Sequence, residues 1–152
     1  MLVTINTDAS FNPVLKVGAY AFWIVCDQGR IMNSGVLKGE IGNSTEAEVR
    51  CIVNALHALY RARFSNVHKV IINTDCLHFH SYIGKRKRKE VSSVFQSIAS
   101  RIASEYALKS GWIEFRHVKA HSGKAEKRKW VNDWCDKKAK EALKQMKTKN
   151  KN

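Results

Sequence analysis

The alternation of hydrophobic and polar residues predicts strands in the first third of the chain. Apolar or β-branched residues at positions 3, 5 and 7 alternate with polar ones, which predicts a short strand that ends at Asp8. Residues 19–26 form an apolar run rich in aromatic and β-branched types. A turn at 27–30 joins this run to a returning segment at 31–39, so the two segments predict a hairpin.

The rest of the chain alternates between helical and strand patterns. Apolar residues recur at i, i+3 and i+4 in three segments, which predicts helices over about 47–59, 91–106 and 131–144. Short β-branched runs predict two more strands, at 68–74 and 112–118. The resulting β-β-β-α-β-α-β-α order demands parallel strands and predicts one α/β domain. We place this domain at 1–146 and expect 147–152 to be a basic flexible tail.

Composition narrows the class of protein. Of the 152 residues 44% are hydrophobic, which is enough for one core and excludes disorder for most of the chain. There are 27 Lys and Arg against 13 Asp and Glu, a net charge of +14 that predicts a polyanionic partner. No apolar run is long enough to span a membrane, the start lacks a signal peptide's basic region, and the four cysteines never approach C-x-x-C spacing. We therefore expect a cytoplasmic protein with reduced thiols, and a monomer.

A repeated tetrapeptide closes two of the predicted strands with a carboxylate. Ile-Asn-Thr-Asp occurs at 5–8 and again at 72–75. The carboxyl ends of strands are where ligands bind in open α/β sheets, and neighbouring strands would place Asp8 and Asp75 side by side. Aspartates in strand-terminal turns are common for structural reasons, but the matched pair in so basic a protein favours a functional site.

Further acidic residues stand near the starts of two predicted helices. Glu46 and Glu48 begin the first, where Thr45-x-x-Glu48 also fits a capping box. Asp133 and Asp136 lie near the start of the last, where acids interact favourably with the helix dipole. If both helices start over the same edge of the sheet, carboxylates from four segments converge, and such like charges require divalent cations between them. Oxygen ligands select Mg²⁺ or Mn²⁺, so the pattern predicts two-metal phosphodiester hydrolysis.

Five short motifs occur in a fixed order along the chain: Thr7-Asp8-Ala9-Ser10, Thr45-Glu46-Ala47-Glu48, Asn73-Thr74-Asp75, Val118 to Gly123, and Asn132 to Ala139. In this order the sequence resembles the ribonuclease H family, type 1, over nearly its whole length. The resemblance implies a mixed five-stranded sheet flanked by helices and endonucleolytic cleavage of the RNA strand of RNA–DNA hybrids. It implies two bound Mg²⁺ ions, with Mn²⁺ possible, on four catalytic acids: Asp8, Glu48, Asp75 and Asp136. It leaves Glu46 and Asp133 as the alternatives, and His121 as the residue that assists proton transfer or product release.

The positions expected to contact nucleic acid differ from those of many family members. Members often carry asparagines before the catalytic glutamate and a glutamine after the third acid, whereas this chain has Ser44, Thr45 and Leu77. In the family these amide side chains help to recognise the RNA strand. Asn12 and Asn43, with Ser44 and Thr45, are the candidates for part of that recognition here. Many family members carry a basic protrusion, and at that position this chain has a shorter basic run: Lys85, Arg86, Lys87, Arg88 and Lys89. Such a run would bind phosphates without sequence preference, but a solvated run of charges explains it as well.

These departures leave two alternatives open. One is a nuclease of the same fold that acts on branched or duplex DNA, and the other is a non-catalytic nucleic-acid-binding module. Cleavage of all-DNA substrates would favour the first, and tight binding without turnover would favour the second.

Overall fold

The computed structural model describes residues 1–76, 89–117 and 126–150. These residues form, in chain order, β1 (Leu2–Asn12), β2 (Val17–Cys26), β3 (Gly29–Val36), α1 (Ser44–Ala62), β4 (Lys69–Thr74), α3 (Lys89–Glu105), β5 (Ile113–His117) and α4 (Glu126–Asn150). The predicted element order and the α/β class are therefore confirmed. The third strand differs in its bounds, since it begins at Gly29 directly after a tight turn and ends at Val36.

The five strands make one mixed sheet in the order β3-β2-β1-β4-β5. The first three strands pair antiparallel, whereas β4 lies parallel to both β1 and β5. The repeated tetrapeptides lie in register across the parallel pair, because Ile5 faces Ile72 and Asn6 faces Asn73. The two central strands therefore carry their aspartates at matching positions, as the sequence predicts.

The first strand is longer than predicted. Pairing between β1 and β4 stops at Asn6 and Asn73, but β1 continues beside β2, with Asp8 opposite Ala21, as far as Asn12 opposite Val17. The prediction that the strand ends at Asp8 is wrong, because the hairpin partner supports β1 beyond the end of its parallel neighbour. Asp8 consequently lies inside a strand, just past the level at which β4 ends.

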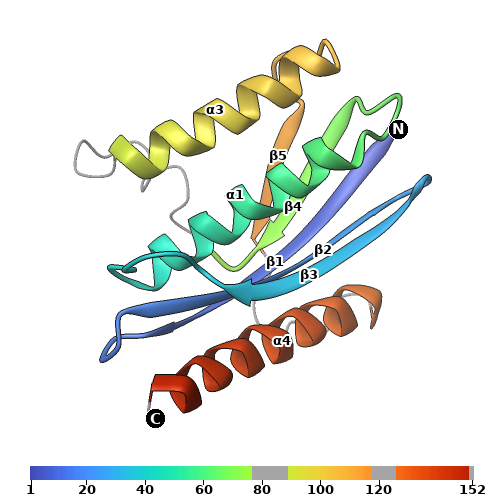
Figure 1. Ribbon diagram of the computed structural model, residues 1–152. Helices are drawn as coiled ribbons and strands as arrows, with labels where there is room; N and C mark the ends of the chain where they lie inside the picture. The colour runs from blue at the N-terminus through green and yellow to red at the C-terminus, as the bar shows by residue number, and fades with distance from the viewer. Residues whose placement is uncertain (77–88, 118–125, 151–152) are drawn as a thin grey trace.

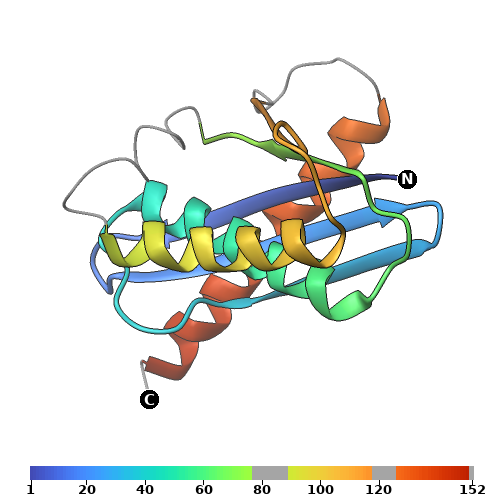
Figure 2. The same ribbon diagram turned by 90° about the horizontal axis from the view of Figure 1, so that it is seen from above.

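Helices cover both faces of the sheet. Helices α1 and α3 lie on one face and α4 lies on the other, as the two views in Figures 1 and 2 show. The main core lies between the sheet and α1 and α3, and its largest fully buried side chains include Phe22, Ile24 and Ile72. A smaller cluster beneath α4 joins Trp23 to Cys135. None of the helices described is long and apolar enough to cross a membrane.

The last helix extends beyond the predicted 131–144 at both ends. It begins at Glu126 and continues to Asn150, so it includes most of the segment expected to be a flexible tail. Only Cys135 and Ala139 of its described side chains are buried, and the apolar periodicity of the helix is weak. A polar helix of this kind leaves little periodic signal at its ends, which explains the missed boundaries. Residues 151–152 lie outside the described residues.

Candidate active site

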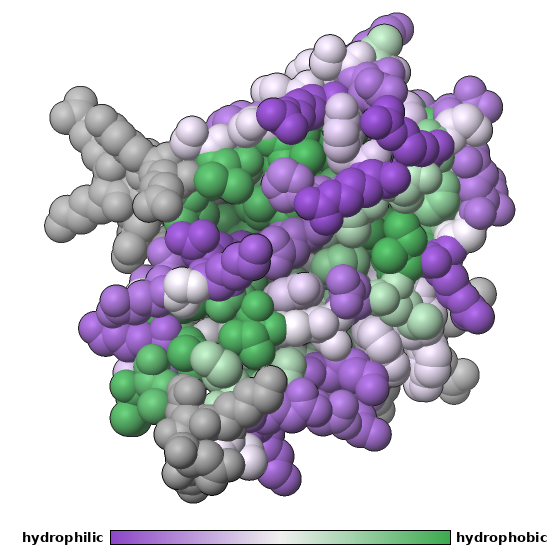
Figure 3. Space-filling model, in the orientation of Figure 1, coloured by the Kyte–Doolittle hydropathy of each residue, from purple (hydrophilic) through white to green (hydrophobic). Residues whose placement is uncertain are grey.

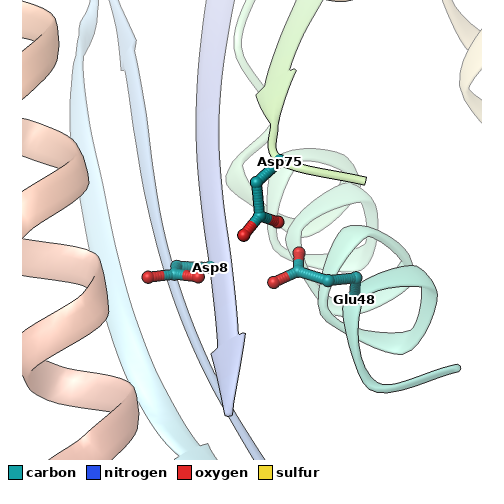
Figure 4. A group of neighbouring side chains, drawn as sticks. All are labelled: Asp8, Glu48 and Asp75. Atoms are coloured by element: carbon teal, nitrogen blue, oxygen red, sulfur yellow. The ribbon is translucent and has the colours of Figure 1, made fainter. Parts of the chain in front are cut away.

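Three acidic side chains from separate elements converge beside β1. Asp8 comes from β1, Glu48 from α1, and Asp75 from the residue after β4. Figure 4 shows the carboxylates of Glu48 and Asp75 pointing toward each other, with the Asp8 carboxylate next to them on the side of β1 that faces α4. One carboxylate oxygen of each lies within 4.8 Å of the others. Glu48 is only 7% exposed, whereas Asp75 is exposed. The group is therefore open to solvent on the side of Asp75.

The start of α1 explains why Glu48, and not Glu46, joins this group. Asn43 caps the helix, since its side chain accepts the Glu46 N–H at 2.8 Å. Glu46 in turn accepts the Gly42 N–H at 2.7 Å and lies 3.7 Å from the Arg50 guanidinium. The Thr45–Glu48 capping box is therefore wrong: the helix begins two residues earlier and Glu46 has the capping role. Glu48 has no capping role, and its carboxylate lies near Asp75 at the end of β4.

A single backbone N–H ties two of the acids together. The Ala9 N–H donates to Asp8 Oδ1 at 2.9 Å and to Glu48 Oε1 at 2.7 Å. This donor is available because β4 ends before it could pair with β1 at this level. Glu48 Oε2 is buried and has no hydrogen-bond partner among the residues that the structure describes. A buried carboxylate oxygen without a donor is costly, and a bound cation would satisfy it.

The repulsion among the carboxylates of this group also favours the binding of cations. Burial, followed by the nearby carboxylates of Asp75 and Asp136, raises the pKa of Asp8 from 3.8 to about 8. Burial and then Asp75 and Asp8 raise the pKa of Glu48 well above its ordinary value. The protein thus holds several carboxylates closer together than their charges favour. With oxygen as the only ligand atom among the three acids, the site fits a hard divalent cation such as Mg²⁺ or Mn²⁺.

The fourth predicted acid lies at the edge of the group, on α4. Asp136 lies close enough to Asp8 for its carboxylate to raise the pKa of Asp8, while Asp133 is exposed on the same helix. Lys140 follows Asp136 by one turn, and its Nζ lies 2.9 Å from Asp136 Oδ2. Lys140 is not among the predicted site residues, although an acid and a lysine four residues apart on a helix are a recognisable pair.

Two buried features beneath the acids were also missed. The Asn73 side-chain amide donates to Asn6 Oδ1 at 3.1 Å, which joins β1 and β4 two residues before Asp8 and Asp75. Cys51 and Cys135 are buried near the acids, and the Cys51 thiol lies 3.3 Å from the Asp8 carbonyl oxygen. The two asparagines belong to the repeated tetrapeptides, so their shared position was the available signal. All four cysteines are thiols.

The remaining predicted residues are spread more widely. Asn12 is the last residue of β1, where its side chain accepts the N–H groups of Val14 and Leu15 in the turn that follows, and Asn43 caps α1. Ser44 and Thr45 lie in the first turn of α1, four and three residues before Glu48. His121 and the basic run from Lys85 to Arg88 lie outside the described residues, and Lys89 begins α3.

Comparisons with known proteins agree with this architecture. The RNase H family model matches residues 2–144. RNase H1 of the halophilic archaeon Halobacterium salinarum superposes with a TM-score of 0.65 at 15% identity, covering 95% of this chain and 99% of that one. The N-terminal RNase H domain of rv2228c from Mycobacterium tuberculosis gives 0.70 at 13% identity, with 98% of each chain covered.

A third structure similar to this chain contains nucleic acid. LC11-RNase H1, here in complex with an RNA/DNA hybrid, superposes with a TM-score of 0.60 at 20% identity, covering 93% of this chain and 99% of that one. No curated protein matches the sequence. The structural likenesses establish the fold, and the family model spans nearly the whole chain. As its motif order predicts, the chain belongs to the RNase H family and is a ribonuclease H enzyme.

Proposed function

We propose that this ribonuclease H hydrolyses the RNA strand of RNA–DNA hybrids with two divalent metal ions, Mg²⁺ or Mn²⁺. The observation that carries the proposal is the convergence of Asp8, Glu48 and Asp75, with their oxygens within 4.8 Å, in a chain that the RNase H model matches almost end to end. A hybrid is the ligand of a structurally similar protein, LC11-RNase H1. The net charge of +14 suits a duplex of phosphates.

The acids would divide the work by their positions. Asp8 lies near both Asp75 and Asp136, so Asp8 and Asp75 would hold both ions, while Asp136 would bind one of them. When bound, two divalent ions supply an activated water and stabilise the leaving oxygen. Glu48, held at Oε1 by the Ala9 N–H, has Oε2 left for a cation and for orienting water. We assign His121 the transfer of a proton or the release of product, on the resemblance of its motif alone.

We also propose that the basic run from Lys85 to Lys89 grips phosphates and that Ser44 and Thr45 contact the RNA strand. The position of Ser44 and Thr45 in the helical turn before Glu48 supports their part of this proposal. Asn43 and Asn12 have their side-chain oxygens engaged in a helix cap and a turn, so only their amide groups are left to contact a substrate. We propose that the protein acts as a monomer in the cytoplasm, and the four thiols support that location.

The test is cleavage of a labelled duplex series, RNA–DNA, RNA–RNA and DNA–DNA, with Mg²⁺, with Mn²⁺ and with chelator. Asp75→Asn is the site variant, and Asp133→Asn is its matched control, since it removes the same charge from an exposed position. We expect metal-dependent cleavage of the hybrid's RNA strand, lost in Asp75→Asn and kept in Asp133→Asn. Equal cleavage of the DNA duplex would indicate the DNA-specific alternative, and full activity of Asp75→Asn would refute the assignment of the site.

A further inference from the structure

A second polar groove runs along the side of α1 that faces away from the acids. Six residues of α1 line it, and four of them are polar or charged: Arg50, Asn54, His57 and Arg61. Their spacing of four, three and four residues places them in one stripe along the helix. Glu48 precedes Arg50 by two residues, which is about 200° around the helix axis. The groove and the acid cluster therefore lie on opposite sides of α1.

The groove is walled by other elements and has a volume of about 400 Å³. The edge strand β3 contributes Asn33, the segment after it contributes Lys38, and α3 contributes residues of its first two turns. Tyr20 and Phe22 form the floor, with their rings stacked at 6.0 Å. Figure 3 shows hydrophilic side chains beside hydrophobic ones on the side of the molecule where α3, α1 and β3 face the viewer.

The charges in the groove are positive and poorly compensated. No carboxylate is among the described residues that line it. Arg50 lies 3.7 Å from Glu46, a loose pair, and its buried Nε has no acceptor among the described residues. Burial, and then the cations of Arg61 and Arg101, lower the pKa of His57. Cationic side chains without carboxylate partners gain stability when an anion lies beside them.

We propose that this groove binds the phosphodiester chain of single-stranded nucleic acid, as a second contact surface separate from the acid cluster. Arg50 and Arg61 are eleven residues apart on α1, a distance of about 16 Å along the helix. A strand carries a phosphate about every 3.4 Å when stacked and less densely when extended, so the row of donors meets several phosphates. The aromatic floor and apolar walls suit sugars and bases, as in other single-strand grooves. A single phosphate ion would contact the cations at only one end of the groove.

The probe is a 5′-phosphorylated tetrathymidylate, which carries four phosphates, added to the wild-type protein in chelator. Backbone and side-chain amide NMR signals report the position of binding, and an affinity series in salt reports the number of phosphate contacts. Arg61→Gln removes one cation of the groove, and Lys109→Gln removes the same charge from an exposed turn beyond α3. We expect the largest shifts at Asn33, Asn54 and His57. We expect Arg61→Gln to weaken binding about 3- to 10-fold and to lower the salt slope by about 0.7, with Lys109→Gln nearly unchanged.

Three results would overturn the inference. The first is that shifts occur only on other surfaces, and the second is that the two variants weaken binding equally. The third is that orthophosphate or thymidine monophosphate binds as tightly as the tetranucleotide, which would indicate a small anion pocket. The inference borrows from the proposed function only the class of ligand. Because the probe is DNA and no metal is present, its failure is independent of the outcome of the hybrid cleavage assay.

Discussion

Replacing Asp8 by Asn should stabilise the metal-free protein, and the gain should grow with pH. The substitution keeps the size of the side chain and an oxygen that accepts the Ala9 N–H, but removes the charge that burial and the carboxylates of Asp75 and Asp136 oppose. The pKa of Asp8 is raised from 3.8 to about 8 in the folded protein. Its contribution to stability is therefore fully present below about pH 3.8 and is lost as the pH rises through 8.

The magnitude follows from proton linkage. Between pH 5 and 8 the folded protein keeps a proton on Asp8 that the unfolded chain has released, and each pH unit is worth about 1.4 kcal/mol. The wild-type protein in chelator should therefore lose up to about 4 kcal/mol of unfolding free energy over this interval relative to Asp8→Asn. Adding millimolar Mg²⁺ at pH 8 should restore stability to the wild type and leave Asp8→Asn nearly unchanged, because ligand binding to the folded state stabilises it.

The assay is urea denaturation followed by tryptophan fluorescence at pH 5, 6.5 and 8, in chelator and with Mg²⁺. Asp133→Asn is the control, since it removes one carboxylate from an exposed position on α4. Its stability should follow that of the wild type at every pH. Parallel curves for wild type and Asp8→Asn from pH 5 to 8 would refute the reasoning, because they would mean that the folded protein does not oppose the charge on Asp8.

Three further outcomes are expected. Glu48→Gln should lower hybrid cleavage at least about 100-fold, whereas Glu46→Gln should stay active and lose about 1 kcal/mol of unfolding free energy with the capping contact, as initial rates and urea denaturation would show. Asp136→Asn should reduce the cleavage rate at least about tenfold while Asp133→Asn does not; equal effects would contradict the position of Asp136 beside Asp8. Asn73→Ala should cost about 1–3 kcal/mol of stability, because it leaves a buried side-chain oxygen without its donor.

Sequence patterns predicted those parts of the site that depend on regular pairing. The two Ile-Asn-Thr-Asp segments predicted neighbouring strands, and their register follows from buried isoleucines and asparagines placed at the same positions in both. The helix that carries Glu48 was evident because its buried positions recur with helical spacing. In both cases a local pattern is sufficient to place the acid, because the buried residues that fix the strand or helix in the core also fix the direction of its acidic side chain.

Other features depended on tertiary choices that the sequence leaves open. Asn43, Ser44 and Thr45 are all able to cap a helix, and only the choice of Asn43 assigns Glu46 to the cap. The length of α4 was missed because its polar residues carry almost no period. The position of Asp136 depended on how α4 crosses the sheet, which no local pattern records. For that residue the resemblance to the family supplied what the spacing could not.

The acid cluster forms because β1 extends beyond the end of its parallel neighbour, β4. Where β4 ends, β1 keeps its antiparallel partner, so the Ala9 N–H has no strand to bond and donates to the carboxylates of Asp8 and Glu48. At the same level Asp8 lies opposite Ala21, which packs beneath α4, so its side chain meets Asp136 on that face. If β4 continued beside β1 at this level, it would accept the Ala9 N–H and would separate the acids on the two faces of the sheet. The end of one strand therefore creates both the donor that positions the acids and the gap through which acids from opposite faces of the sheet can share cations.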